Sequence, residues 1–266
     1  MEHIGEILSG NNLRTNSSRE CAFCGAQLEP MALILGRPFG AKRCTCEGAR
    51  AYWQERDEIA AQERRAEEEA QRKERLETLF RNSMLPSRWK NRTFENFVLT
   101  ENNQTAFERA RQYAERFDAN SGDGLLFTGD VGLGKTHLAA AIAMHLLERE
   151  HTVVFGTVTS LLSQLRNTYD DHRETEKDVM RRLTRCQLLV IDDLGKEKVS
   201  PWVEQTVFEI INARYDDNKS VIITTNMDLP EIEKKYKDNG KALLDRIFEM
   251  CKGIKLSGKS WRKQGM

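Results

Sequence analysis

The sequence lacks both a long apolar run and an excess of charge of either sign. No stretch approaches the roughly 18 apolar residues that a membrane-spanning helix requires, and charged residues make up 31% of the 266-residue chain. We therefore exclude a membrane protein and expect no membrane partner. Lysine plus arginine and aspartate plus glutamate both number 41, so the chain lacks the large positive charge of a nucleic-acid coat protein. Any contact with DNA must be local.

The sequence also lacks the pattern of a secretory signal. Its first residues, MEHIGEILSG, contain no basic segment followed by an apolar stretch. The six cysteines are therefore expected to be reduced thiols or metal ligands rather than disulfides. We expect a cytoplasmic protein.

Four of the six cysteines lie in the first fifth of the chain. They form a C-x2-C pair and a C-x-C pair separated by about twenty residues, namely Cys21, Cys24, Cys44 and Cys46. Four thiolates suit tetrahedral zinc, with incidental cysteines or a redox pair as the alternatives. A module this small cannot build an apolar core, so the metal would supply its folding energy. We assign residues 1–48 to a zinc-binding module.

A long charged segment follows the cysteines. From Glu47 to Asn82 about half of the residues are charged, and no glycine or proline follows Gly48 before Pro86. These strong helix formers predict an exposed helix. Its apolar positions are too sparse and irregular for a coiled-coil seam. We take residues 49–85 as a helical linker.

Residues 86–266 alternate between apolar segments and helical stretches. The apolar segments, which we expect to be strands, are Leu125–Thr128, Val153–Gly156, Leu188–Ile191, Val221–Thr224 and, more weakly, Gly253–Leu256. This alternation predicts an α/β domain in which a five-stranded parallel sheet is covered on both faces.

The strongest motif lies between the first of these strands and a helix. It fits the P-loop pattern and consists of Gly129, Asp130, Val131, Gly132, Leu133, Gly134, Lys135 and Thr136. The glycines let backbone N–H groups point at phosphates, and the helix N-terminus adds its dipole. We expect Lys135 to reach the β and γ oxygens of ATP and the Thr136 hydroxyl to ligate magnesium. His137 follows directly and is included in the expected nucleotide site, although its spacing fits no metal or triad pattern.

A second motif, LLVIDD, follows the P-loop by about 50 residues. It is an apolar strand that ends in Asp192 and Asp193. We expect Asp192 to hold magnesium, directly or through water, and Asp193 to orient and polarise the water that attacks ATP.

Further residues suit the AAA+ class of P-loop ATPases. Asn226 ends the next strand, Arg246 lies on a helix expected over Ala242–Cys251, and Arg262 follows the last strand. Asn226 is a candidate for holding the attacking water. Arg246 could reach a neighbouring subunit, and Arg262 could reach the nucleotide of its own subunit. Phe94 and Phe97 are candidates for the adenine site. Each has an ordinary alternative: a turn cap, a solvated arginine or a core phenylalanine.

In combination, these motifs resemble the DnaC/DnaI-like bacterial and phage helicase loaders, whose ATPase core is shared with the transposition helper IstB. The resemblance covers roughly Arg92 to Lys263 and is carried by TFENF, GDVGLGKTHLA, LLVIDDLG, INARYDDNKSVIITTN, DRI and GKSWRK. It implies that Asn226, Arg246 and Arg262 are a sensor, an arginine finger acting in trans and a second sensor. It also implies an AAA+ core without a helical lid domain. Asp193 stands where glutamate is usual in AAA+ enzymes.

The resemblance implies an ATPase that self-assembles on ATP or its partner and delivers a replicative hexameric DNA helicase to single-stranded DNA. In that family the ATPase core holds DNA partly through a helix, here Ser160–Thr168, and the basic stretch Lys252–Lys263 is a further candidate. Zinc-bearing N-terminal modules occur in phage and DnaI-like loaders, where they engage the helicase, and IstB proteins typically lack a four-cysteine module. The alternatives are an IstB-like helper of a transposase on duplex DNA, a nucleotide-gated adaptor with negligible hydrolysis, and a small-molecule P-loop kinase.

Overall fold

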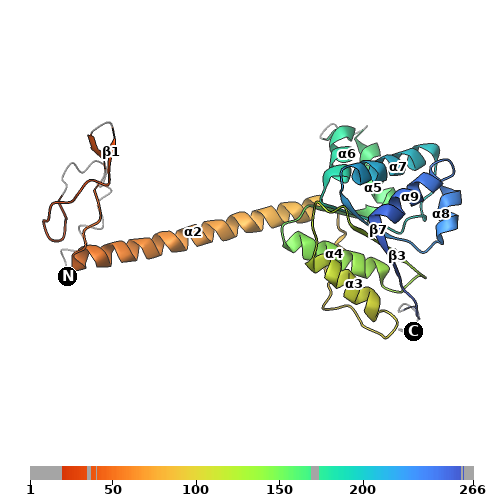
Figure 1. Cartoon of the computed structure of the whole chain (residues 1–266), viewed down its shortest axis with the longest axis horizontal. Helices are drawn as coiled ribbons and strands as arrows, with labels where there is room; N and C mark the ends of the chain where they lie inside the picture. The colour runs from red at the N-terminus through yellow and green to blue at the C-terminus, as the bar shows by residue number, and fades with distance from the viewer. Residues whose placement is uncertain (1–19, 35–36, 40, 169–173, 259, 261–266) are drawn as a thin grey trace. The chain divides into compact units, whose positions relative to one another are not determined.

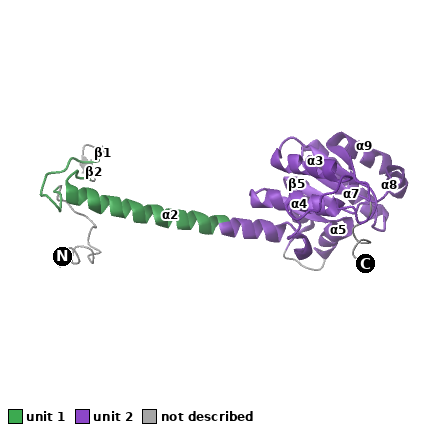
Figure 2. Cartoon of the chain, turned by 90° about the horizontal axis from the view of Figure 1, so that it is seen from below, with its two compact units in different colours: residues 1–72 green, residues 73–266 purple. Residues whose placement is uncertain are grey.

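The computed structural model describes residues 20–34, 37–39, 41–168, 174–258 and 260. The chain divides into two compact units, residues 1–72 and residues 73–266 (Figure 2). Among the described residues, no helix combines the length and apolar character needed to span a membrane.

The first unit contains a two-stranded antiparallel sheet, β1 (Ala32–Ile34) with β2 (Arg37–Phe39). A tight turn precedes it, in which the Gly25 N–H donates to the Cys21 carbonyl at 2.8 Å. Gly25 has a φ of 70°, a left-handed conformation that favours glycine. This turn brings the first two cysteines close together.

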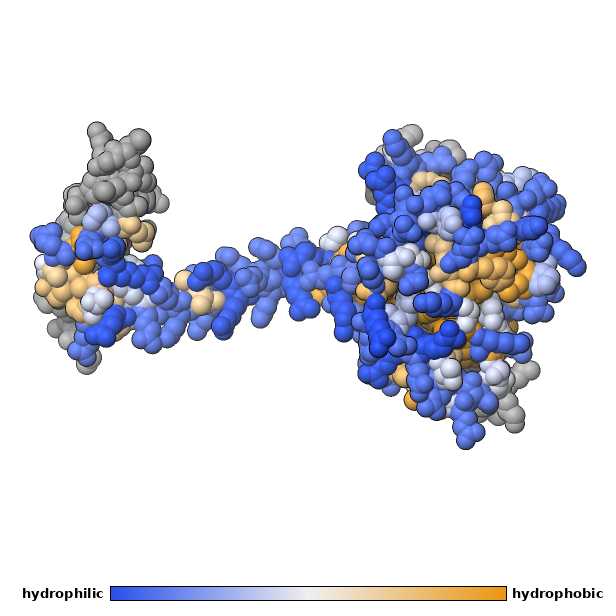
Figure 3. All heavy atoms as spheres, in the orientation of Figure 1, coloured by the Kyte–Doolittle hydropathy of each residue, from blue (hydrophilic) through white to orange (hydrophobic). Residues whose placement is uncertain are grey.

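Helix α2 runs from Glu47 to Asn82, as predicted, and the boundary between the two units falls within it. Its 36 residues include one buried side chain, Ala49. Hydrophilic residues cover most of the face of α2 that is seen in Figure 3. The prediction of an exposed helix is therefore confirmed.

The second unit is built on a five-stranded parallel sheet in the order β4-β5-β6-β3-β7. Its strands are β3 (Gly124–Thr128), β4 (Val153–Thr157), β5 (Leu188–Asp192), β6 (Ser220–Thr224) and β7 (Cys251–Lys255). All five were predicted, and the last begins two residues earlier than its apolar pattern indicated. The α/β prediction is confirmed.

Helices cover both faces of this sheet (Figure 1). They are α3 (Gln104–Glu115), α4 (Lys135–Glu148), α5 (Val158–Asn167), α6 (Glu176–Arg185), α7 (Pro201–Asp216), α8 (Leu229–Lys235) and α9 (Gly240–Met250), with a short 3-10 helix over Ser87–Trp89. Along β3, Leu125 and Phe127 pack with α3 and α4, whereas Leu126 packs with the helices of the other face. This alternation follows from the two-residue period of a strand.

The parallel arrangement places the predicted site motifs at one edge of the sheet. In the register of the strands, Phe127 pairs with Thr224, and Ile191 pairs with Ile223. The P-loop, Asp192 and the end of β6 therefore lie side by side at the carboxyl ends of the strands, where open α/β sheets bind ligands.

Candidate functional site

A pocket of about 340 Å³ lies at this carboxyl edge. Its walls come from the segment before α3, the P-loop, and the ends of β5 and β6. The lining residues are Trp89, Arg92, Asn96, Phe97, Val98, Val131, Gly132, Leu133, Gly134, Lys135, Thr136, His137, Asp193, Lys196 and Asn226. Most of the predicted nucleotide-binding segment is therefore gathered around one cavity.

The P-loop glycines adopt conformations that other residues rarely take. Gly134, the residue before α4, has a φ of 97°, and a Cβ there would lie 2.8 Å from the Phe97 ring. Gly129 has a φ of 129°, and a Cβ there would collide with the Leu256 carbonyl. These two positions therefore require glycine, and the resulting turn presents the N-terminus of α4 to the pocket.

Lys135 lies at the first position of α4 and is 4% exposed. Its ammonium group donates to the carbonyls of Gly129 at 2.6 Å and Asp130 at 2.7 Å. Burial lowers the pKa of Lys135, and the nearby Asp193 carboxylate opposes that shift. The positive charge thus lies inside the P-loop, where the phosphates of a nucleotide would bind.

Asp192 is held by two hydroxyl groups from different elements. Its Oδ1 accepts from Thr136 at 2.8 Å and from Thr224 at 2.7 Å. Burial raises the pKa of Asp192, and the two hydroxyl bonds oppose that shift. Hydroxyl and carboxylate oxygens are ligands that magnesium prefers. The residues therefore fit the predicted magnesium site of Thr136 and Asp192.

Asp193 has a φ of 56° and lines the pocket. Its Oδ1 accepts from the Asn226 amide at 3.1 Å, and its Oδ2 lies 2.6 Å from the Lys196 ammonium. Its backbone N–H donates to the Thr224 hydroxyl at 2.9 Å. The structure therefore brings Asp193 and Asn226 together at the pocket, in a position to orient a water molecule.

Several residues at the site were not identified from the sequence, among them Thr224, Lys196 and Trp89. Thr224 contacts both aspartates, and its place at the end of a strand beside LLVIDD was the available signal. Lys196 and Trp89 belong to no motif. Of the two phenylalanine candidates for the adenine site, Phe97 lines the pocket, and Phe94 is absent from its described lining. Phe94 is 9% exposed and packs edge-on against Phe107 in the core.

His137 lines the pocket, and its role there is partly structural. Its Nε2 lies 2.9 Å from the Thr93 carbonyl, and its ring packs edge-on against Phe97 at 5.0 Å. Burial lowers the pKa of His137. His137 thus fixes the segment before α3 against the P-loop helix.

Arg246 lies on α9 and is absent from the described residues that line the pocket of its own chain. Its guanidinium stacks on the Tyr215 ring at 4.2 Å, and its Nε donates to the Asn212 Oδ1 at 3.2 Å. The side chain is 34% exposed. It is therefore held in a defined position while remaining accessible from outside the chain.

The structure describes one of the two segments predicted to contact DNA in full and the other in part. Arg262 lies outside the described residues, as do other members of the Lys252–Lys263 stretch. The helix expected over Ser160–Thr168 is present as α5, Val158–Asn167, capped by the Thr157 hydroxyl.

The sheet order, the P-loop and the paired aspartates define an ATP-binding protein of the AAA+ class. A model of the family described as IstB-like ATP binding protein matches residues 46–266, so the chain belongs to that family.

The chain resembles proteins of two kinds within this group. Replicative helicase loader DnaC of Escherichia coli (strain K12) is 31% identical over 174 residues, which cover 65% of this chain and 69% of DnaC. The insertion sequence IS5376 putative ATP-binding protein of Geobacillus stearothermophilus is 30% identical over 189 residues, 70% of this chain and 73% of that protein. A crystal structure of the DnaC helicase loader matches with a TM-score of 0.58 at 26% identity. The match covers 65% of this chain and 100% of the crystallised chain.

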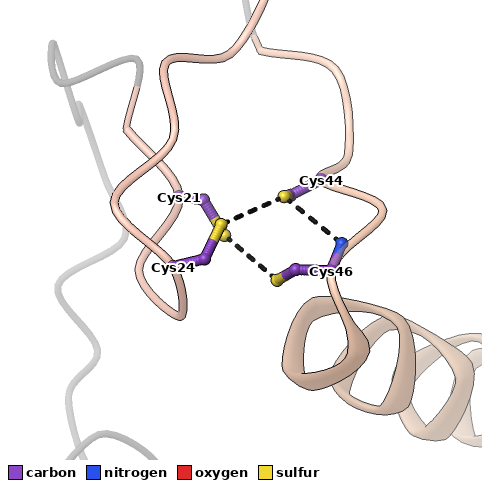
Figure 4. A group of neighbouring side chains, drawn as sticks. All are labelled: Cys21, Cys24, Cys44 and Cys46. Carbon is purple, nitrogen blue, oxygen red and sulfur yellow. Dashed lines mark hydrogen bonds between the residues drawn. The ribbon is translucent and has the colours of Figure 1, made fainter.

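The four N-terminal cysteines form a second candidate site (Figure 4). Their sulfur atoms all lie within 4.8 Å of one another. Cys21 Sγ is 3.8 Å from Cys46 Sγ, and Cys24 Sγ is 3.6 Å from Cys44 Sγ. A tetrahedral zinc ion with Zn–S bonds of about 2.3 Å requires sulfur atoms about 3.8 Å apart. The cluster therefore fits zinc.

The cluster contains one acidic thiol. The backbone N–H groups of Phe23 and Cys24 lower the pKa of the Cys21 thiol to about 6. At Cys24 the Ala26 backbone N–H lowers the pKa, but the neighbouring thiols outweigh it and raise the pKa above its usual value. Thiolate is the form that binds metal. Four thiols converging on one point favour an ion over a single redox pair.

The phosphate-binding loop generates the first prediction. We expect Lys135→Ala to weaken ATP binding at least about tenfold, because it removes the cation from the P-loop. Asp193→Asn should leave the Kd for ATP within about threefold and lower kcat about a hundredfold, because it removes the carboxylate that we expect to orient the attacking water. Fluorescent-nucleotide titration and phosphate release measure the two quantities. Unchanged hydrolysis by Asp193→Asn would show that another residue orients the water.

The thiol cluster generates the second prediction. The purified protein should contain about one zinc ion per chain, and Cys21→Ser combined with Cys44→Ser should remove it by deleting two of four ligands. Elemental analysis measures the metal. Cys251→Ala, in the other unit, is the control and should retain it. Stoichiometric zinc in the double variant would contradict the assignment, and ATP binding by that variant should be unchanged.

Proposed function

We propose that the chain hydrolyses ATP at the P-loop pocket. Magnesium, held by Thr136 and Asp192, would supply charge neutralisation at the β and γ phosphates. Lys135 would bind the same phosphates. Asp193 and Asn226 would orient and polarise the attacking water, because their polar atoms meet at the pocket wall. A nucleotide-gated adaptor that scarcely hydrolyses ATP is the alternative, which phosphate release by the parent chain tests.

We further propose that hydrolysis is completed by Arg246 of a neighbouring subunit. Arg246 is held by Tyr215 and Asn212, and its guanidinium is accessible from outside its own chain. A guanidinium placed at the γ-phosphate stabilises the charge of the transition state. This role requires self-assembly on ATP or on the partner. Arg262 is proposed to contact the nucleotide of its own subunit.

The cellular role that we propose is ATP-dependent loading of a replicative hexameric DNA helicase onto single-stranded DNA in the cytoplasm. The main support for this role is the four-thiol cluster. It lies in a separate N-terminal unit, which precedes a domain similar to a replicative helicase loader. A separate N-terminal unit gives the chain a surface for the helicase that is independent of its nucleotide site. The α5 helix and the basic residues from Lys252 onward are the proposed DNA contacts.

A second candidate is supported by the relative from an insertion sequence. That protein is 30% identical over 189 residues, a match similar in extent to the helicase loader. In this alternative the chain would assist a transposase on duplex DNA. A small-molecule kinase is disfavoured because Asn226, Arg246 and Arg262 together suit an AAA+ ATPase.

Partner capture generates the third prediction. The chain should co-purify with the hexameric replicative helicase of its host, and the variant that combines Cys21→Ser with Cys44→Ser should lose this binding while retaining ATP binding. Lys135→Ala is the matched variant in the other unit and should keep its zinc. Retention of a transposase on duplex DNA, with no binding to the helicase, would favour the second candidate.

Assembly generates the fourth prediction. Arg246→Ala should bind ATP with a Kd within about threefold of the parent, yet lose about a thousandfold in hydrolysis, as for arginine fingers of other P-loop enzymes. Mixing it with Lys135→Ala should restore part of the activity, because each Lys135→Ala subunit still donates Arg246. Steady-state ATPase assays over a range of mixing ratios measure this recovery. No recovery at any ratio would place Arg246 outside the neighbouring site.

A further inference from the structure

The loop after β5 contains a buried carboxylate that does not reach the nucleotide pocket. Glu197 is 7% exposed and is absent from the described residues lining that pocket. Its Oε2 accepts from the Gly195 backbone N–H at 3.0 Å, and its Oε1 accepts from the Tyr236 hydroxyl at 2.8 Å. Glu197 therefore joins the loop to the residue that follows α8.

The end of α8 holds the same loop through a second contact. The Lys235 ammonium donates to the Gly195 carbonyl. Tyr236 has no exposed surface, so its hydroxyl depends on Glu197 for a hydrogen bond in the protein interior. Both backbone polar groups of Gly195 are thus bound by side chains, with Glu197 on the N–H and Lys235 on the carbonyl.

This loop positions two residues of the nucleotide site. Asp193 and Lys196 lie on either side of Gly195 in this loop, and both line the pocket. The backbone between them is left-handed at Asp193, with a φ of 56°, and at Gly195, with a φ of 96°. Left-handed backbone is costly for a residue with a side chain and persists where its surroundings hold it. The contacts of Gly195 supply that constraint two residues from Asp193.

We propose that Glu197 is a positioning residue for hydrolysis, which holds Asp193 in place by anchoring Gly195 to Tyr236. The proposal rests on the proposed ATPase activity. It requires the two hydrogen-bonding groups at the end of the Glu197 side chain rather than its charge. A glutamine retains an acceptor for Gly195 and donates its amide to the tyrosine hydroxyl, which can accept. A methionine of similar length offers neither contact.

The test compares three variants in the full chain. Glu197→Met should lower kcat about tenfold or more, because Gly195 loses its acceptor, and the Kd for ATP should stay within about twofold because the P-loop is untouched. Glu197→Gln should recover kcat to within about threefold of the parent. Tyr236→Phe should lower kcat about threefold and should add nothing further when combined with Glu197→Met, since it acts through Glu197.

A control variant and the parent complete the experiment. Tyr113→Phe removes a hydroxyl that donates to the Asp123 carbonyl at 2.8 Å, far along the chain from this loop, and should leave kcat unchanged. Tyr236→Phe keeps the buried ring, so its kcat still tests the proposal if Glu197→Met does not fold. Parental kcat in both Tyr236→Phe and Glu197→Met would overturn the proposal, as would a glutamine variant as slow as the methionine one. Absence of turnover in the parent would instead remove the proposed ATPase activity, and the role of Glu197 with it.

Discussion

The Asp192 carboxylate is the point at which the nucleotide site is tied to the sheet. One of its oxygens accepts hydroxyl bonds from Thr136 on α4 and Thr224 on β6, while the residue itself ends β5. A buried carboxylate is costly unless such bonds compensate it. The bonds therefore fix three elements around one atom, and Thr224 also accepts the Asp193 N–H. The Thr224 hydroxyl therefore links the position of Asp193 to that of Asp192.

Charge placement around the pocket follows from this arrangement. Lys135 is buried within the P-loop, and Lys196 forms an ion pair with Asp193. Three cationic side chains, Arg92, Lys135 and Lys196, and the Asp193 carboxylate therefore line a cavity of about 340 Å³. Phosphate groups entering it would meet the P-loop amides and Lys135, and their charge would compete with Asp193 for Lys196. The lining also includes the rings of Trp89 and Phe97.

Local patterns predicted those parts of the molecule that local chemistry determines. Helix α2 was predicted with its observed ends, because charge, composition and the absence of glycine act within the segment. The five strands and the P-loop followed from periodicity and a contiguous motif. Contacts such as Thr224 with Asp192, or Glu197 with Tyr236, join residues about 30 to 40 positions apart. Thr224 was signalled only by its place at the end of a strand, and nothing local distinguishes Glu197 or Tyr236 from ordinary polar residues.

The segment from Asn226 to Arg246 connects the two halves of the proposed mechanism. Asn226 contacts Asp193 at the chain's own pocket, and Arg246, on α9, is absent from the described residues that line that pocket. Between them the chain is anchored twice by buried carboxylates: Tyr236 donates to Glu197, and the Asn239 N–H donates to Glu204 on α7 at 2.8 Å. Because these anchors belong to the loop after β5 and to the helix that follows it, the start of α9 is positioned by the same region that carries Asp193. Arg246, which would contact the ATP of a neighbouring subunit, is thus positioned by the same loop and helix that surround the nucleotide pocket of its own chain.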